Sequence, residues 1–193
     1  MPDVDLSNLV AAAVRLQDDW EARGIDFCFI GGLAVQFWGE PRLTSDVDAS
    51  VWTEFGNERP VIDKLLQNLS SRIEDAAGFA LVNRVLLVQE SFGINVDISM
   101  AAFPFELELI KRSQKRPYRG GAMLRICEAS DLIILKAFAN RPRDWQDIRG
   151  VLIRSQGELD WQHINTELAM LSELKEEPEI MEQLTNLRNA TSY

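Results

Sequence analysis

Apolar side chains recur at helical spacing over the first part of the chain and then give way to short alternating or wholly apolar runs. Residues 6–23 carry apolar side chains at intervals of three and four, which predicts an amphipathic helix that ends at Gly24. The segment Asp26-Phe-Cys-Phe-Ile30, apolar after its first residue, predicts a buried strand, and 33–38 predicts a short helix. From residue 46 onward apolar and polar positions alternate, as in a strand with one buried face.

The middle of the chain continues this mixture of strand and helix patterns. Further helices are expected near 59–69 and 104–112. Strands are expected within 79–89, over 94–99 and within 118–127. These patterns together predict a mixed β-sheet with flanking helices.

Strand patterns are scarce in the last third of the chain. Four helices are expected there, at 131–139, 143–155, 160–174 and 178–188. Ser130 is the predicted N-cap of the first of them. The fold class predicted is therefore α+β, with a mixed sheet and flanking helices in residues 1–128 and a helical C-terminal region in residues 129–193.

Composition and charge exclude several classes of protein. The chain has 193 residues, of which 46% are hydrophobic, and a formal net charge of -10. The acidic balance disfavours a broad nucleic-acid surface, which needs a basic face. No secretory signal pattern and no bilayer-length apolar run is present, so we expect a cytoplasmic protein without a membrane partner. A single histidine and two cysteines argue against a zinc site.

Three aspartates form the candidate metal site. Asp46 and Asp48 lie two positions apart on one predicted strand, so their side chains face the same side, opposite Val47. Asp97 lies on a second alternating strand. If the two strands are neighbours, the three carboxylates converge, and Mg²⁺, which prefers oxygen ligands, would relieve their repulsion. The alternative is that the Asp-x-Asp pair lines the wet face of a half-exposed strand.

Gly31 and Gly32 separate the predicted buried strand from the helix that follows it. Backbone amides at such a turn, together with the helix N-terminus, can approach an anion. The segment lacks the features of a Walker loop and of a dinucleotide fingerprint. Tight packing of the helix against the strand explains two glycines equally well.

In combination these motifs resemble the nucleotidyltransferase superfamily related to DNA polymerase β. The runs Phe29-Ile-Gly-Gly-Leu-Ala-Val35 and Gly39-Glu-Pro-Arg-Leu-Thr-Ser-Asp-Val-Asp48 are similar to its glycine turn and Asp-x-Asp signature. Asn-Val-Asp97 is similar to its third carboxylate. Within the superfamily the branch that contains AbiEii-type toxins and antibiotic nucleotidyltransferases is the most similar, and the segment 129–147 resembles a later motif of that branch. The resemblance spans about residues 27–152.

The resemblance implies a reaction in which a nucleoside monophosphate moves from a nucleoside triphosphate to an acceptor hydroxyl and pyrophosphate is released. It implies one or two Mg²⁺ ions, with Asp46 and Asp48 as ligands. Asp97 would help to bind a second ion or act as base toward the acceptor. Gly31 and Gly32 would face the triphosphate.

Four further residues are candidates for contacts with the phosphates. Thr44 and Ser45 could bond phosphate oxygens or simply form the turn that enters the strand. Arg42 could reach a phosphate or lie solvated in its loop. Lys136 shares an apolar helical face, so it either extends to water or pairs with an anion in a cleft, and the resemblance favours a catalytic, phosphate-facing role.

Asp144 and Asp147 are three residues apart and therefore neighbours on a helix. Structural ion pairing is the favoured interpretation for both, with Arg143 as a candidate partner of Asp147.

The sequence does not identify the acceptor of the nucleoside monophosphate. A small molecule, an RNA end or a protein hydroxyl would all suit the chemistry. The alternative to an enzyme is a non-catalytic nucleotide-binding or partner-binding module on the same fold, similar to an antitoxin and acting with a cognate partner protein in a toxin–antitoxin pair.

Overall fold

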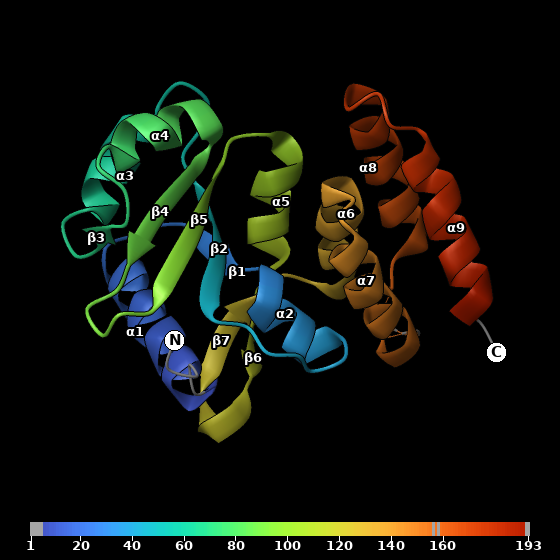
Figure 1. Ribbon diagram of the computed structural model, residues 1–193, viewed down its shortest axis with the longest axis horizontal. Helices are drawn as coiled ribbons and strands as arrows, with labels where there is room; N and C mark the ends of the chain where they lie inside the picture. The colour runs from blue at the N-terminus through green and yellow to red at the C-terminus, as the bar shows by residue number, and fades with distance from the viewer. Residues whose placement is uncertain (1–5, 156, 158, 192–193) are drawn as a thin grey trace. The chain divides into compact units, whose positions relative to one another are not determined.

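The computed structural model describes residues 6–155, 157 and 159–191 and divides the chain into two compact units. The first unit contains the chain up to Leu33 together with Leu43–Cys127. The second contains Ala34–Arg42 and the chain from Glu128 onward. The first unit holds a mixed sheet with flanking helices, and the second is helical, so the α+β prediction is confirmed (Figure 1).

A seven-stranded sheet forms the centre of the first unit, with strand order β3-β4-β5-β2-β1-β7-β6 (Figure 1). The strands are β1 (Phe27–Phe29), β2 (Asp46–Trp52), β3 (Ser70–Ser71), β4 (Val85–Gln89), β5 (Asn95–Ala101), β6 (Gln114–Pro117) and β7 (Met123–Ile126). β2 runs parallel to β5, and β1 runs parallel to β7. The other neighbouring strands are antiparallel.

Helices accompany this sheet along the chain. They are α1 (Leu6–Ala22), α3 (Glu58–Leu65), α4 (Ala76–Asn83), α5 (Pro104–Arg112) and the 3₁₀ turn η1 (Arg119–Gly121). The ring of Trp20 in α1 meets the ring of Phe27 edge-on, with centroids 5.0 Å apart. Phe27 is paired with Val51, so α1 covers the face of the sheet that carries these two side chains.

The two faces of β2 differ in polarity. Val47, Ala49 and Val51 are fully buried on the face that α1 covers. Asp46 and Asp48 alternate with them and therefore lie on the opposite face. This alternation is the sequence pattern that predicted the strand, and it separates the core from the candidate site.

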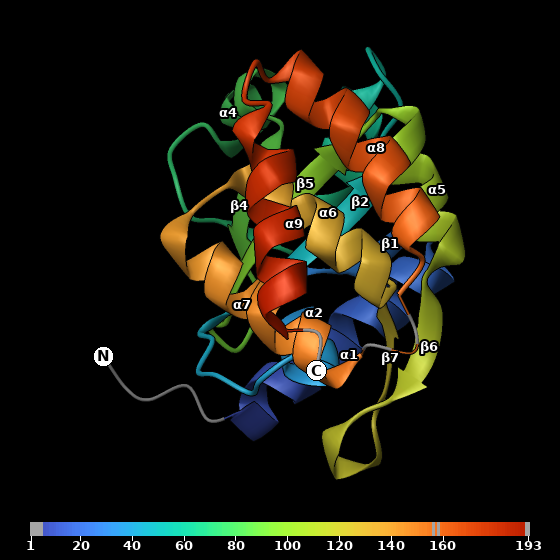
Figure 2. The ribbon, with the colours of Figure 1, turned by 90° about the vertical axis from the view of Figure 1, so that its right-hand side faces the viewer.

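The second unit consists of helices. α2 (Gly31–Trp38) begins in the first unit and ends in the second. The other helices of the second unit are α6 (Ala129–Ala139), α7 (Pro142–Arg154), α8 (Trp161–Leu174) and α9 (Glu179–Thr191). α6 contacts α7 and α8, and α9 contacts the same two helices (Figure 2). Their shared core includes the fully buried side chains of Ile133, Ile148, Ile164, Leu168 and Ile180.

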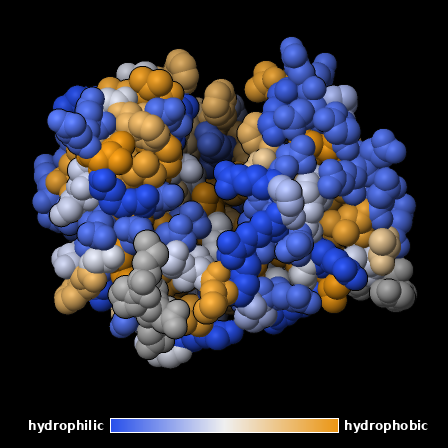
Figure 3. Space-filling model, in the orientation of Figure 1, coloured by the Kyte–Doolittle hydropathy of each residue, from blue (hydrophilic) through white to orange (hydrophobic). Residues whose placement is uncertain are grey.

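Residues 79–83 were expected to be strand but form the end of helix α4. Strand structure begins only at Val85, after Arg84 has ended the helix in a left-handed conformation. The reason is that α4 is apolar on its outer side too: Val82 is 81% exposed and Leu81 is 42% exposed. Figure 3 shows this as apolar surface in the region of α4. A helix without a polar face lacks the helical period that would identify it.

Two helix starts also differ from the sequence prediction. α2 begins at Gly31 rather than after the glycine pair. α6 begins at Ala129 with Glu128 as its N-cap, so the prediction of Ser130 as N-cap is wrong. The Ser130 hydroxyl instead accepts a hydrogen bond of 2.9 Å from the backbone N–H of Asp160.

Across residues 6–155, 157 and 159–191, no helix combines the length and the hydrophobicity that a membrane span requires.

Candidate active site

The register between β2 and β5 brings three carboxylates together in the first unit. Asp48 lies directly opposite Asp97, and Asp46 lies opposite Asn95. Paired residues on neighbouring strands point to the same face of a sheet. One oxygen atom from each of Asp46, Asp48 and Asp97 lies within 4.8 Å of the other two, and all three residues are half-buried. The predicted convergence is therefore observed, while the binding of a metal ion there stays a prediction.

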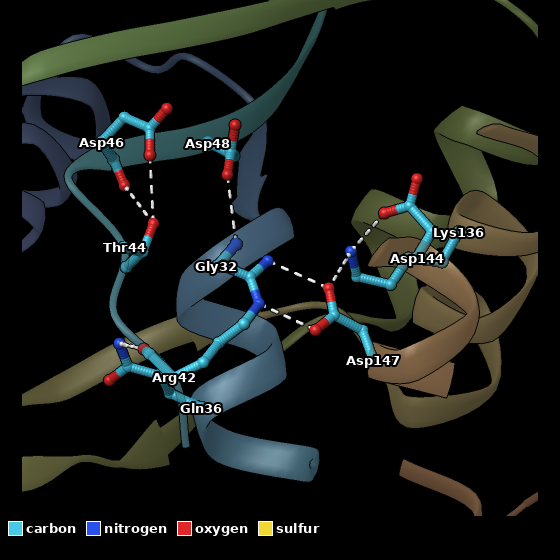
Figure 4. A network of polar contacts seen from close by, with 9 residues as sticks. All are labelled: Gly32, Gln36, Arg42, Thr44, Asp46, Asp48, Lys136, Asp144 and Asp147. Carbon is cyan, nitrogen blue, oxygen red and sulfur yellow. Dashed lines mark hydrogen bonds and ion pairs between the residues drawn. The ribbon is translucent and has the colours of Figure 1, made fainter. Parts of the chain in front are cut away.

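Gly31 and Gly32, at the start of α2, lie beside this cluster. The backbone N–H of Gly32 donates a hydrogen bond of 3.1 Å to Oδ2 of Asp48 (Figure 4). Gly31 has a φ of +53°, and a Cβ atom there would lie 2.0 Å from the same carboxylate oxygen. A Cβ on Gly32 would lie 2.4 Å from Oγ1 of Thr44. Both positions exclude any side chain, and the helix N-terminus borders the carboxylates as a result.

The residues that lead into β2 contribute to the orientation of Asp46. The hydroxyl of Thr44 donates a hydrogen bond of 3.0 Å to Oδ1 of Asp46 (Figure 4). Ser45 follows it and is exposed, directly before the strand begins. Thr44 thus meets two parts of the site, the glycine pair and the first carboxylate.

Arg72 is a site residue that the sequence analysis missed. Its Nη1 atom lies 2.5 Å from Oδ1 of Asp97, and the two side chains are 27% and 32% exposed. Arg72 follows β3, which is only two residues long. A strand this short shows no alternation, and an arginine far from the recognisable motifs carries no signal of its own.

A second polar cluster lies in the second unit. Lys136 of α6 reaches two carboxylates of α7, with Nζ 2.8 Å from Oδ1 of Asp144 and 2.7 Å from Oδ2 of Asp147. Arg42 holds Asp147 with two hydrogen bonds, 2.7 Å from Nε to Oδ1 and 2.9 Å from Nη2 to Oδ2 (Figure 4). Gln36 in turn donates to the backbone carbonyl of Arg42 at 3.0 Å.

Asp147 is the centre of this second cluster. Burial on its own raises the pKa of Asp147, but the hydrogen bonds and positive charges of Arg42 and Lys136 outweigh it, and the pKa lies below its ordinary value. Asp147 is therefore ionised at neutral pH. The expectation that both aspartates serve in ion pairs is confirmed, with Arg42 and Lys136 as the partners that the spacing alone did not identify.

The predicted site residues are thus divided between two clusters, each described within its own unit. The first unit brings together Gly31, Gly32, Thr44, Asp46, Asp48 and Asp97. Arg42 and Lys136 belong to the ion-paired cluster of the second unit. The roles of all these residues toward a metal or a nucleotide stay predictions.

The donor set of the first cluster fits a magnesium ion. Carboxylate oxygens are the ligands that Mg²⁺ prefers, and Mg²⁺ commonly takes one or two of them and leaves positions for phosphate oxygens. The absence of a Cβ at Gly31 lets the Asp48 carboxylate lie directly against the start of α2. Backbone amides at the start of α2 are suited to an anion that accompanies the metal.

Comparisons with known proteins agree with this arrangement. A family model described as "Nucleotidyltransferase of unknown function (DUF6036)" matches residues 5–189. The crystal structure of an antigenic nucleotidyltransferase-like protein from Paracoccidioides brasiliensis is similar in fold, with a TM-score of 0.53 and 14% identity over 93% of each chain. No curated protein matches the sequence.

Two further solved structures are more distant. The solution structure of the antibiotic-resistance factor ANT(2'')-Ia has a TM-score of 0.45 and 14% identity, and the match covers 95% of this chain and 91% of that chain. The crystal structure of ANT(2'')-Ia in complex with adenylyl-2''-tobramycin has a TM-score of 0.44 and 11% identity, covering 95% and 98% of the two chains.

Proposed function

We propose that the chain, which belongs to this family of nucleotidyltransferases, is a Mg²⁺-dependent enzyme. It would move a nucleoside monophosphate from a nucleoside triphosphate to an acceptor hydroxyl. Pyrophosphate is the leaving group: the acceptor oxygen forms a bond to the α-phosphorus as the bond to the bridging oxygen breaks. The observation that carries the proposal is the meeting of three aspartate oxygens within 4.8 Å on one face of the sheet.

In this proposal the three aspartates have different roles. Asp46 and Asp48 hold a magnesium ion through their carboxylate oxygens, and the chemistry that such an ion supplies is stabilisation of negative charge on phosphate oxygens. Asp97 either contributes a ligand to a second ion or accepts the proton of the acceptor hydroxyl at a carboxylate oxygen. Thr44 keeps Asp46 oriented through the 3.0 Å hydrogen bond to Oδ1.

The start of α2 would bind the triphosphate. Gly31 and Gly32 have no side chains, so phosphate oxygens can approach the backbone at the start of α2, where the positive end of the helix dipole favours them. The N–H of Gly32 would exchange its present acceptor, Oδ2 of Asp48, for a phosphate oxygen. Ser45, which is exposed beside Asp46, offers a hydroxyl to the same phosphates. Thr44 can do so only by leaving its present carboxylate partner.

Arg42 and Lys136 are proposed to contact the phosphates, although both side chains already form ion pairs. Each now bonds Asp147, and Lys136 is 7% exposed. A phosphate would therefore either share the cation with Asp147 or displace that carboxylate from it. A Lys136 side chain that met no phosphate would act through the helices it joins rather than on the substrate.

The acceptor class stays as broad as the chemistry allows: a small molecule, an RNA end or a protein hydroxyl. A cognate partner protein, as in a toxin–antitoxin pair, belongs to the same proposal. The competing function is a nucleotide-binding module without turnover.

The test is to incubate the protein with Mg²⁺ and each nucleoside triphosphate labelled on the α-phosphate, together with total cell RNA, total protein or a small-molecule extract. We expect the label to appear in one acceptor fraction with an equal amount of released pyrophosphate. Asp48→Asn should abolish both signals because it removes a charged ligand at the centre of the cluster.

Asp63→Asn is the matched control, since Asp63 lies in an exposed ion pair with Arg59 on α3 and should retain full activity. Triphosphate binding without transfer to any acceptor would support the non-catalytic module instead. Absence of triphosphate binding at millimolar Mg²⁺ would exclude both functions.

A further inference from the structure

We propose that Arg72 is a positioning residue that competes with a second divalent cation for Asp97 and so controls how many metal ions the site holds. The inference deepens the proposed function and rests on it. It concerns a residue outside the recognisable motifs of the chain and makes a prediction about metal binding that does not require turnover.

The strand register explains how Arg72 reaches the site. Ser71 pairs with Val88, and the next residue, Arg72, donates its backbone N–H to the carbonyl of Leu87 at 3.1 Å. Leu87 pairs with Asp97, and Asp97 pairs with Asp48. Leu87, Asp97 and Asp48 therefore form one row across β4, β5 and β2, and Arg72 continues that row directly after the end of β3.

Residues in such a row project from the same face of the sheet. The backbones of Arg72 and Asp97 are two strand spacings apart, about 10 Å. The long arginine side chain crosses over the β4 position and places Nη1 2.5 Å from Oδ1 of Asp97. The contact thus follows from the register of the sheet, which places Arg72, directly after β3, in line with Asp97.

Each of the three carboxylates has a donor group beside it. Asp46 accepts a hydrogen bond from the Thr44 hydroxyl, and Asp48 accepts one from the Gly32 amide. Asp97 accepts one from the positively charged guanidinium of Arg72. Arg72 therefore occupies, with its guanidinium, a position at which a second cation would have to bind Oδ1 of Asp97.

Partial exposure of both side chains makes this ion pair reversible. The Arg72 and Asp97 side chains are 27% and 32% exposed, and an ion pair that water reaches contributes little free energy, so Arg72 can leave Asp97 at low cost.

Mn²⁺ binding to the nucleotide-free protein, followed by electron paramagnetic resonance, tests the inference directly. The wild type should bind one ion firmly and a second one weakly. Arg72→Gln should tighten the second site by about fivefold or more, the lower range for coupling between two ligands. Arg59→Gln, which removes an exposed arginine from α3, should leave both sites unchanged.

Two more variants keep the result interpretable. Arg72→Lys retains the positive charge and should keep the weak second site, which also controls for a general effect of changing residue 72 on folding. Asp97→Asn should remove the second site in both the wild-type and the Arg72→Gln backgrounds. An Arg72→Gln protein that is folded, as judged by circular dichroism, and binds the second ion no more tightly than the wild type would overturn the inference.

The same titration separates this inference from the proposed function. If Mn²⁺ binding is lost in Asp48→Asn but unchanged in Arg72→Gln, the proposed metal site stands and the role of Arg72 is wrong. If the wild type binds no Mn²⁺, or if Asp48→Asn binds as the wild type does, the proposed metal site is wrong and the role of Arg72 falls with it.

Discussion

Gly31 combines two constraints that usually occur at separate residues. Its φ of +53° lies in the left-handed region, which costs a residue with a Cβ about 1–2 kcal/mol. In addition, a Cβ there would lie 2.0 Å from Oδ2 of Asp48. The sequence identified Gly31 as part of a motif, but it left packing against the strand and approach to an anion as equal explanations. The contact with Asp48 depends on a residue 17 positions away and becomes visible only in three dimensions.

Gly31→Ala should therefore be much more harmful than an ordinary glycine replacement. We expect the free energy of unfolding to fall by about 2–5 kcal/mol, the sum of the backbone cost and the cost of overpacking. Urea denaturation measures this loss. Mn²⁺ affinity should fall as well, because the methyl group displaces the Asp48 carboxylate.

Gly24→Ala is the matched control for Gly31→Ala. Gly24 has a φ of +60°, and a Cβ there would meet no atom within 4 Å. It should lose only about 1–2 kcal/mol and keep the Mn²⁺ affinity of the wild type. Equal losses in the two variants would mean that the contact with Asp48 does not constrain residue 31.

At the scale of elements, the parts of the site on long, half-buried strands were the predictable ones. β2 and β5 alternate between buried and half-buried residues around their aspartates, so the face that each aspartate takes on its own strand followed from spacing. β3 is two residues long and both its residues are exposed, so neither the strand nor Arg72 beyond it left a pattern. Likewise, Asp144 and Asp147 were recognisable as neighbours on one helix, whereas Arg42 lies 105 positions from its partner.

The junction of α6 and α7 depends on a lysine that is buried in ion pairs. Lys136→Met leaves Asp144 and Asp147 buried without their shared cation, and we expect the free energy of unfolding to fall by about 3 kcal/mol. Urea denaturation again provides the measurement. Lys111→Met is the control, because Lys111 is 58% exposed in its ion pair with Glu108 and its loss should leave the unfolding curve unchanged. A neutral result for Lys136→Met would mean that the pairs contribute no net stability to the second unit.

At the scale of the whole molecule, the α+β class and the change from a sheet to helices along the chain were predictable, because they follow from periodicity summed over long segments. The assignment of Ala34–Arg42 to the helical unit was not, since these residues lie between two strands of the sheet in the sequence. The second half of α2 and the loop after it join that unit through contacts such as the two hydrogen bonds from Arg42 to Asp147. Contacts between segments that are far apart in sequence leave no local pattern to detect.

Charge linkage predicts how the stability of the whole molecule depends on pH. In the first unit the hydrogen bond from Arg84 lowers the pKa of Glu58. In the second unit burial raises the pKa of Asp147, but Arg42 and Lys136 outweigh it and lower the pKa below its ordinary value of 3.8. When the folded pKa is the lower one, the unfolded chain binds protons first as the pH falls. Both groups therefore stabilise the fold above their ordinary pKa values, and this contribution is lost as the pH falls through the folded ones.

The free energy of unfolding should consequently decline between about pH 5 and pH 3 and change little from these groups above that range. Asp147→Asn should be less stable than the wild type at neutral pH, because Lys136 and Arg42 lose a charged partner, but its decline on acidification should be shallower. Urea denaturation at a series of pH values measures both effects. Asp63→Asn, which alters an exposed pair, should keep the wild-type slope. An unchanged slope in Asp147→Asn would show that the buried ion-pair cluster does not contribute to acid denaturation, and that the loss arises from other carboxylates such as Glu58.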